Sequence, residues 1–250
     1  MEAKEFSESG DPIYRYDNVE PKSFTPAIGD VDNIEAISNH IEKNIGKIHC
    51  VFHEVISDLV HIDVHWVKPT EKFPFHSLVT SGMSDIAMKT PEGLEQNQYA
   101  ELCILLPENW KIDGANYELM TEVFKEEINY WPVRWLKTIA RFPHEYDTWV
   151  GHGHTIPNGM EAEPYAANTK LGCMLLLPSI SLGTQFFELK ITEKIIRFYC
   201  LYPIYKEEME FKLKNGSDAL IDKFEKYNIS DIVDINRRNT CIKKGLWGLW

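Results

Sequence analysis

Two histidines one residue apart raise the question of which chemistry this chain could perform. Residues 149–159 read WVGHGHTIPNG, and His152 and His154 would point to the same side of an extended segment. Imidazole nitrogens bind zinc and related ions, but two of them fill only half of a tetrahedral shell. A metal site in this segment therefore needs further ligands from elsewhere in the chain.

A second segment offers such ligands. Residues 60–67 read VHIDVHWV, in which His61, Asp63 and His65 fall on one face of the expected strand. Two imidazoles and one carboxylate on a shared face form a recognised type of metal-binding group. One interpretation of the chain is therefore a metal-dependent hydrolase that uses His61, Asp63, His65, His152 and His154.

The same strand pattern supports a simpler interpretation. Val60, Ile62, Val64 and Trp66 occupy the alternate positions and would face a core. The histidines and the aspartate are then the polar, solvated face of a half-buried strand. We favour this interpretation and expect no bound metal and no other cofactor.

The glycine-rich segment is predicted to be a structured turn. Gly151, Gly153 and Gly159 can adopt positive φ angles or allow close backbone approach, and the Pro-Asn-Gly sequence at 157–159 is a turn signal. Such a turn would present an aromatic anchor with a polar rim to a partner protein. We expect this partner-binding surface to consist of Met83, Asp85, Trp149, His152, His154, Thr155, Asn158, Asn168 and Lys170.

No residue is predicted to be catalytic, so the chain is not expected to be an enzyme. Ser81 lies in TSGMSD, which lacks the Gly-x-Ser-x-Gly elbow of serine hydrolases. A predicted helix over 116–129 carries several acidic residues, which form either a solvated face or a surface for a basic enzyme. These residues are Glu118, Glu122, Glu126 and Glu127.

The overall charge narrows the range of partners. The 250 residues carry a formal net charge of −12, which disfavours binding to nucleic acid because the phosphate backbone is also negative. A basic protein partner would suit this charge, although the charge also serves simply to keep the protein soluble.

The cysteines and the apolar runs indicate a cytoplasmic protein. The five cysteines are widely spaced and form no Cys-x-x-Cys pair, which is typical of free thiols in a reducing compartment. The N-terminal segment lacks the apolar core of a signal peptide. No apolar run approaches the ~18 residues of a membrane span, so no membrane association is expected.

Hydrophobic periodicity predicts alternating clusters of helices and strands. The fold class expected from them is α/β, a single domain with a mixed β-sheet covered by helices. The continuous apolar run 171–178 is predicted to be a strand deep in the sheet. The other predicted strands are 48–56, 60–67, 77–84 and 99–107 with two more in 186–203, and the other predicted helices are 31–45, 132–142, 205–216 and 217–229.

Three parts are expected along the chain. Residues 1–30 show no periodic apolar pattern and are predicted to be an N-terminal arm or linker whose removal leaves stability nearly unchanged. Residues 31–244 form the domain. The last six residues, 245–250, read GLWGLW and form an apolar tail that either docks on the domain or binds a partner.

Several long motifs, in this order, resemble the suppressor of fused domain family, and the resemblance covers roughly residues 31–240. They are HIDVHWVKPT (61–70), LVTSGMSD (78–85), YAELCILLP (99–107), GHGHTIPNG (151–159), NTKLGCMLLLP (168–178) and FYCLYPIYKEEMEFKLKNGSDALIDKF (198–224). Animal members of this family carry a second domain and hold zinc-finger transcription factors inactive by binding a short peptide. This chain is similar to the bacterial single-domain form.

The resemblance implies a protein-binding function without catalytic residues. Many bacterial members look like immunity proteins, antitoxins that inhibit a cognate toxin. The resemblance therefore implies an inhibitor that occludes the active site or substrate groove of its partner. The expected partner is a basic toxin domain, or an extended peptide captured by strand addition.

Overall fold

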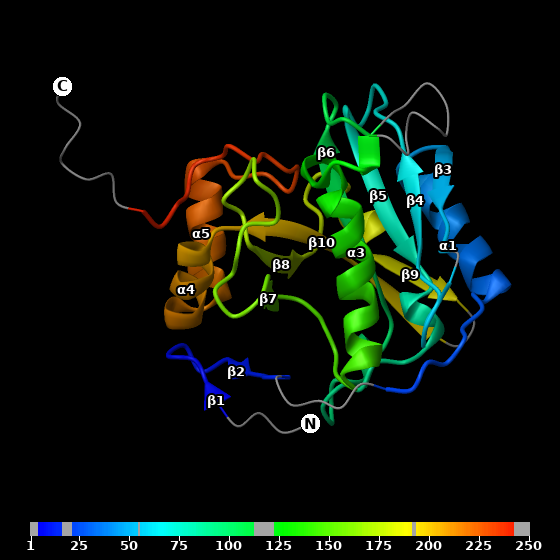
Figure 1. Ribbon diagram of the computed structural model, residues 1–250, viewed down its shortest axis with the longest axis horizontal. Coiled ribbons are helices and arrows are strands. Elements are labelled where there is room, and N and C mark those ends of the chain that lie inside the picture. Colours follow the sequence, from blue (N-terminus) through cyan, green and yellow to red (C-terminus); the bar gives the residue numbers. More distant parts are fainter. Residues whose placement is uncertain (1–4, 17–21, 55, 113–122, 192–193, 243–250) are drawn as a thin grey trace.

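Apolar runs of strand length assemble into one mixed β-sheet with helices on both faces (Figure 1). The computed structural model describes residues 5–16, 22–54, 56–112, 123–191 and 194–242. Its strands are β1 (Glu5–Phe6), β2 (Pro12–Ile13), β3 (Ile48–Phe52), β4 (Asp63–Val67), β5 (Phe75–Ser81), β6 (Ala100–Pro107), β7 (Thr155–Pro157), β8 (Cys173–Leu177), β9 (Glu188–Ile191) and β10 (Lys194–Ile204). Its α-helices are α1 (Val31–Asn44), α3 (Glu127–Glu145), α4 (Lys206–Asn215) and α5 (Ser217–Tyr227).

The main sheet has eight strands in the order β3-β4-β5-β6-β10-β8-β7, with β9 beside β10. The pair β6–β10 is parallel, and the other neighbours run antiparallel. Parallel neighbours need a long crossover, and the chain between β6 and β10 supplies it with α3 and β7 to β9. The predicted fold class, a single α/β domain with a mixed sheet under helices, is confirmed.

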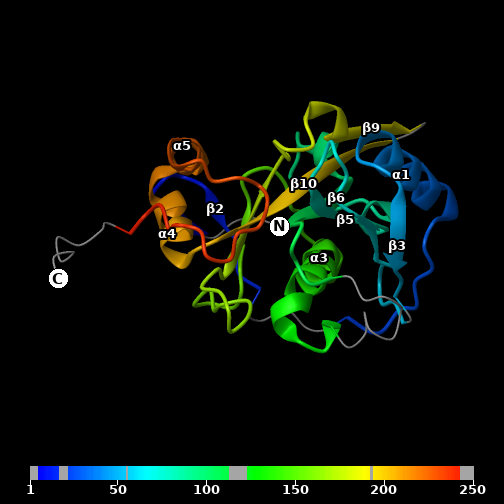
Figure 2. The ribbon, with the colours of Figure 1, turned by 90° about the horizontal axis from the view of Figure 1, so that it is seen from above.

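Two separate cores explain why β8 is apolar throughout. Its alternate residues Met174 and Leu176 belong to the core under α3, whereas Cys173, Leu175 and Leu177 belong to the core under α1 and α5. Figure 2 shows α3 on one side of the sheet and α1 and α5 on the other. Because both faces are covered, neither set of positions can be polar, and the prediction of a deeply buried strand is confirmed.

Helix α1 forms where the isoleucine spacing predicts it. The Asp30 side chain accepts hydrogen bonds from the backbone N–H groups of Asp32 and Asn33, which caps the first turn. Ile37 and Ile41 are both 0% exposed and lie on the sheet side of the helix. The second predicted helix, 132–142, is part of the longer α3, and the predicted helix 116–129 lies partly outside the described residues.

One strand expectation is wrong. Strand β4 begins at Asp63 rather than at residue 60, and all five of its residues are buried. Asp63 and His65 are 3% and 1% exposed, so they do not form a solvated face. Strand β4 is shielded from solvent because it pairs with β3 and β5 at its two edges and packs against core residues on both faces.

The N-terminal arm is docked on the domain wherever the structure describes it. The Tyr16 ring lies 5.0 Å from the rings of both Phe142 and Tyr146, and its hydroxyl donates to Thr148 Oγ1 at 2.7 Å. The β1–β2 hairpin lies beside α4, where Ser9 N–H donates to Leu213 O. A loosely attached arm is therefore not what the structure contains.

The remaining expectations concern thiols, membrane spans and the tail. All five cysteines are free, and Cys103, Cys173 and Cys200 are buried. None of the helices in the described ranges has the length and apolar character needed to cross a bilayer. The tail 245–250 lies outside the described residues.

Candidate functional site

The loop that links α3 to β8 is held in place by backbone hydrogen bonds. Gly153 N–H donates to Leu176 O, and Leu176 N–H donates to His154 O, which aligns the loop with β8 just before β7. Gly153 has φ +77° and Gly159 has φ +69°, so both occupy the conformation that favours glycine. The structured turn predicted for this segment is present.

Residues 158–172, the second half of this loop, fold back on themselves, and their close backbone contacts leave little room for side-chain atoms. The Asn158 side-chain amide donates to the backbone oxygens of Glu163 and Pro164, at 2.8 and 3.3 Å. A Cβ atom on Gly172 would lie 2.0 Å from Ala162 O, which is far inside contact distance. Residues 158–172 therefore form a rigid excursion, and a rigid loop is a suitable scaffold for binding residues.

Trp149 is half-buried. Its ring packs against the core under α3, and the His154 ring meets it edge to face at 4.4 Å between centroids. Its indole Nε1 is buried and has no hydrogen-bond partner among the described residues. The role of Trp149 as the centre of a partner-binding surface stays a prediction.

His154 is half-buried beside the Trp149 ring. Burial lowers the pKa of His154 from its ordinary 6.5 to about 4, and the nearby positive charge of Lys212 acts in the same direction. The imidazole is therefore neutral near pH 7. His152, by contrast, is exposed, and Thr155 and Asn158 are half-buried.

Two residues of the expected surface lie in other surroundings. Met83 is 0% exposed and belongs to the core under α3, so it cannot contact a partner. The Asp85 carboxylate accepts from Asp30 N–H at 2.9 Å and from Asn33 Nδ2 at 2.5 Å, which anchors the start of α1. Met83 is therefore a correction to the expected surface, whereas Asp85 is half-buried and Asn168 and Lys170 are exposed.

The five proposed metal ligands do not assemble into one site. His65 Nε2 lies 2.9 Å from Ser81 Oγ, and burial lowers the pKa of His65 to about 4. Within the described ranges, the one group of three ligand atoms close enough to share an ion contains His61 and Asp63 but not His65, His152 or His154. Its third member is His53, which sequence reasoning did not single out.

An exposed acidic surface lies where the rigid loop meets the start of α4. Three carboxylates, those of Glu161, Glu163 and Glu210, lie close enough to Lys206 to raise the pKa of its ammonium group, which lies 2.6 Å from Glu161 Oε2. Met160, next in the chain, is 76% exposed. We call this surface the acidic face; it consists of Met160, Glu161, Glu163, Glu207 and Glu210.

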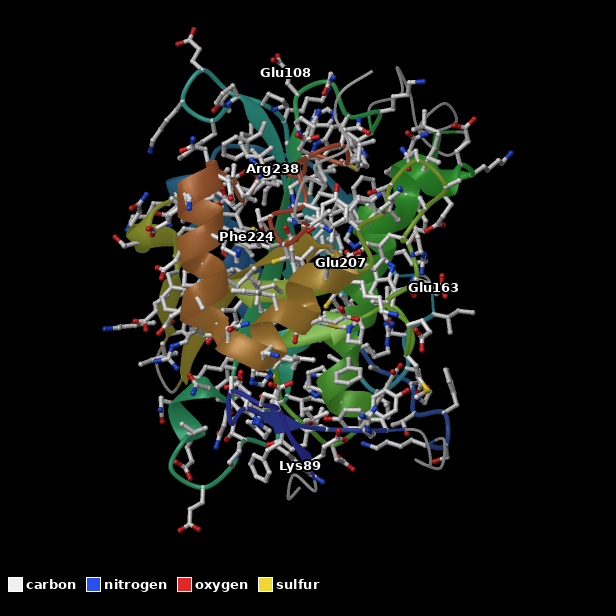
Figure 3. All side chains as sticks on the ribbon, turned by 90° about the vertical axis from the view of Figure 1, so that its left-hand side faces the viewer. Lys89, Glu108, Glu163, Glu207, Phe224 and Arg238 are labelled. Atoms are coloured by element: carbon white, nitrogen blue, oxygen red, sulfur yellow. The ribbon has the colours of Figure 1, made fainter. Side chains whose placement is uncertain are left out.

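Figure 3 views this end of the molecule and labels Glu163, from the loop, and Glu207, from α4. Both are exposed, as is Glu210 one turn along the helix. Glu208, between them, points inward and is 0% exposed, paired with Arg237 at 2.6 Å. The sequence signal for the acidic face is the pair of short acidic runs at 161–163 and 207–210, which only the fold brings together.

The acidic face has the chemistry of a binding surface. Exposed carboxylates attract a basic partner, and an exposed methionine offers a flexible apolar contact that adapts to the partner's surface. No acid–base pair with a substrate pocket accompanies these residues in the part of the chain that the structure describes.

Comparison with known structures gives the same fold. The suppressor of fused homologue from Neisseria gonorrhoeae FA 1090 aligns with a TM-score of 0.59 at 17% identity, over 86% of this chain and 100% of the homologue. The Sufu–Fu complex aligns with a TM-score of 0.57 at 13% identity, over 83% and 92%. Drosophila Suppressor of Fused aligns with a TM-score of 0.55 at 12% identity, over 83% and 51%.

The family model gives the assignment. No curated protein matches the chain. The model described as "Suppressor of fused protein (SUFU)" matches residues 58–238, which is most of the chain and includes β4 to β10, α3 to α5 and the acidic face. The predicted resemblance is confirmed, and the chain belongs to the suppressor of fused protein family.

Proposed function

We propose that this chain is a protein-binding module that inhibits a basic partner by covering it with the acidic face. In its most specific form, the proposal is a bacterial, cytoplasmic immunity protein that neutralises a cognate toxin by occlusion. The observation that carries the proposal is the gathering of Glu161, Glu163 and Glu210 around Lys206, with the exposed residues Met160 and Glu207 next to them in the chain.

The arrangement suits occlusion rather than catalysis. An inhibitor needs a rigid surface of complementary charge, because rigidity lowers the entropy lost on binding and charge speeds the encounter. Asn158 and Gly172 supply the rigidity, and the net charge of −12 extends the favourable field beyond the face itself. The partner's active-site groove would then be blocked by the loop 158–172.

The relatives support protein binding in general. One of the similar structures is described as the Sufu–Fu complex, which is an assembly with a protein partner. Peptide capture by strand addition is the variant that the family suggests, but the sheet edge next to the acidic face is poorly suited to it. Strand β7 has three residues and ends in Pro157, which has no backbone N–H to donate.

Co-expression tests the immunity proposal. The chain is expressed in cells that also produce the toxin domain encoded beside its gene, and growth is compared with toxin-only cells. We expect wild-type protein and Glu35→Lys, a reversal on the exposed side of α1 at the far end of the molecule, to restore growth equally. The double reversal Glu163→Lys/Glu210→Lys should fail to protect at the same soluble level. Equal protection by all three would contradict the acidic face as the inhibitory surface.

A further inference from the structure

Three side chains at the loop end of the β3–β4 hairpin have no part in the proposed function. His53 Nδ1 lies 2.7 Å from one oxygen of Asp63, and His61 Nε2 lies 3.0 Å from the other. The ligand atoms of all three lie within 4.8 Å of one another. Two imidazole nitrogens and a carboxylate thus converge on one point.

Strand geometry accounts for this convergence. The register pairs Val51 with His65 and Phe52 with Val64, so its continuation places His53 opposite Asp63. His61 precedes Asp63 by two residues and therefore lies on the same side of the chain. Glu54 and Ser57, from the connection between the two strands, contact the cluster.

The surrounding contacts orient the cluster toward a cation. Ser57 Oγ lies 2.6 Å from His61 Nδ1, which leaves Nε2 of the same ring directed at Asp63. Glu54 N–H donates to Asp63 Oδ1 at 3.1 Å and fixes the carboxylate. Metal-binding histidines and carboxylates in proteins are typically held by contacts of this kind.

We propose that His53, His61 and Asp63 form a binding site for one divalent transition-metal ion of the Zn²⁺ class. Imidazole and carboxylate donors in a two-to-one ratio suit Zn²⁺, Co²⁺ or Fe²⁺, while Mg²⁺ and Ca²⁺ prefer oxygen ligands. The site comes from three side chains of one hairpin, and it differs from the set of five residues that the sequence indicated.

Binding requires a local rearrangement of the side chains. Ligands about 2.1 Å from a tetrahedral zinc ion lie about 3.4 Å from one another, whereas the three ligand atoms of the cluster lie within 4.8 Å, so they must approach one another by no more than about 1.4 Å. Each neutral imidazole also shifts its proton to the other ring nitrogen, so that a lone pair faces the ion. In His61 that proton then points at Ser57 Oγ, which can accept it.

The three proposed ligands differ in solvent exposure, and the solvent side of the site has room for a further ligand. The Asp63 and His61 side chains are 4% and 19% exposed, whereas the His53 side chain is 70% exposed. Asp63 and His61 therefore hold the ion from inside, and His53 closes over it from the solvent side. The fourth position of a tetrahedral site is left to water.

Titration of the full chain tests the proposal. Untagged protein is stripped with chelator, and ZnCl₂ binding is measured by calorimetry, with CoCl₂ absorption reporting nitrogen and oxygen ligation. We expect one saturable ion per chain. His53→Ala and Asp63→Asn should each weaken binding by at least ~10-fold, and Ser57→Ala should weaken it by about 10-fold through loss of orientation.

A matched control separates this site from incidental histidine binding. His49→Ala removes an exposed histidine from the same strand and should leave zinc affinity unchanged. His53 is exposed, and in His53→Ala the Asp63 carboxylate keeps its contacts with His61 and Glu54 N–H, so a melt of the metal-free variant establishes that it is folded before its zinc affinity is compared. The absence of one-to-one binding, or equal binding by wild type and His53→Ala, would overturn the site, without bearing on the acidic face.

Discussion

Lys212 Nζ lies 3.1 Å from Asp11 Oδ2, and this ion pair joins the N-terminal hairpin to α4. The Lys212 side chain is 7% exposed, so Asp11 pairs with a nearly buried ammonium group, whereas the neighbouring pair of Lys214 and Glu8 is largely in water. The arm is therefore part of the folded domain at the end of the molecule that carries the acidic face.

The first prediction concerns this ion pair. Asp11→Ala leaves a nearly buried ammonium group without its partner, and we expect it to lower the free energy of unfolding by ~1–2 kcal/mol, because Asp11 itself is partly solvated. Glu8→Ala removes an exposed pair and should change stability by less than ~0.5 kcal/mol. Denaturant melts of both variants check this, and equal effects would mean that the arm does not dock through Asp11.

The second prediction concerns the two cores on either side of β8. Leu175→Asp and Leu176→Asp place a carboxylate in different cores, each costing several kcal/mol, so both variants should fail to accumulate as soluble protein. Ile180→Asp, at a position that is 75% exposed, should express normally. If one of the two leucine variants folds, the face that it occupies is not buried.

The third prediction concerns the rigid loop. Gly172→Ala forces a methyl group against Ala162 O and should destabilise the protein and weaken partner binding together. Gly159→Ala meets no atom within 4 Å but keeps a positive φ, so it should cost only about 1 kcal/mol. Thermal melts rank the two variants, and a milder effect at Gly172 would contradict the close approach.

The fourth prediction concerns pH. The pKa of His154 falls from 6.5 to about 4 on folding, so the unfolded chain binds more protons between these values. The contribution of the neutral His154 side chain to the free energy of unfolding is therefore complete above pH 6.5 and is lost as the pH falls toward 4. Because part of the side chain reaches solvent, we expect a loss on the order of 1–2 kcal/mol.

Denaturant melts at pH 7.5 and pH 4.5 measure this effect. His154→Gln should lose less stability between the two pH values than wild type does. His152→Gln removes an exposed imidazole of the same loop and should follow the wild-type curve. If His154→Gln lost as much stability between the two pH values as wild type does, His154 would titrate normally in the folded protein.

The sequence was informative where one local rule decides the structure. Hydrophobic periodicity predicted the helix over 31–45 that α1 forms, and the unbroken run of β8 indicated burial on both faces. The sequence did not predict the surroundings of a side chain where distant segments provide them. Nothing near Trp149 in the sequence shows that its ring packs partly against the core, and Tyr16 docks on rings more than a hundred residues away.

The acidic face and the His53 cluster could not be predicted for the same reason, because each combines residues from separate segments. Glu161 and Glu207 lie in separate runs that meet only because the loop 158–172 folds back toward α4. His53 joins Asp63 through hairpin register, which the alternation of a single strand cannot reveal. Sequence patterns thus predicted the scaffold, while the candidate sites arise from contacts between its elements.

The most direct test is the affinity of purified protein for the toxin domain, measured by calorimetry at low and high salt. Wild type and Glu35→Lys should bind equally, and added salt should weaken both. Glu163→Lys/Glu210→Lys should bind at least ~10-fold more weakly and lose most of the salt dependence, because complementary charge is removed. Undiminished affinity and salt dependence in the folded double variant would contradict the claim that the acidic face binds the partner.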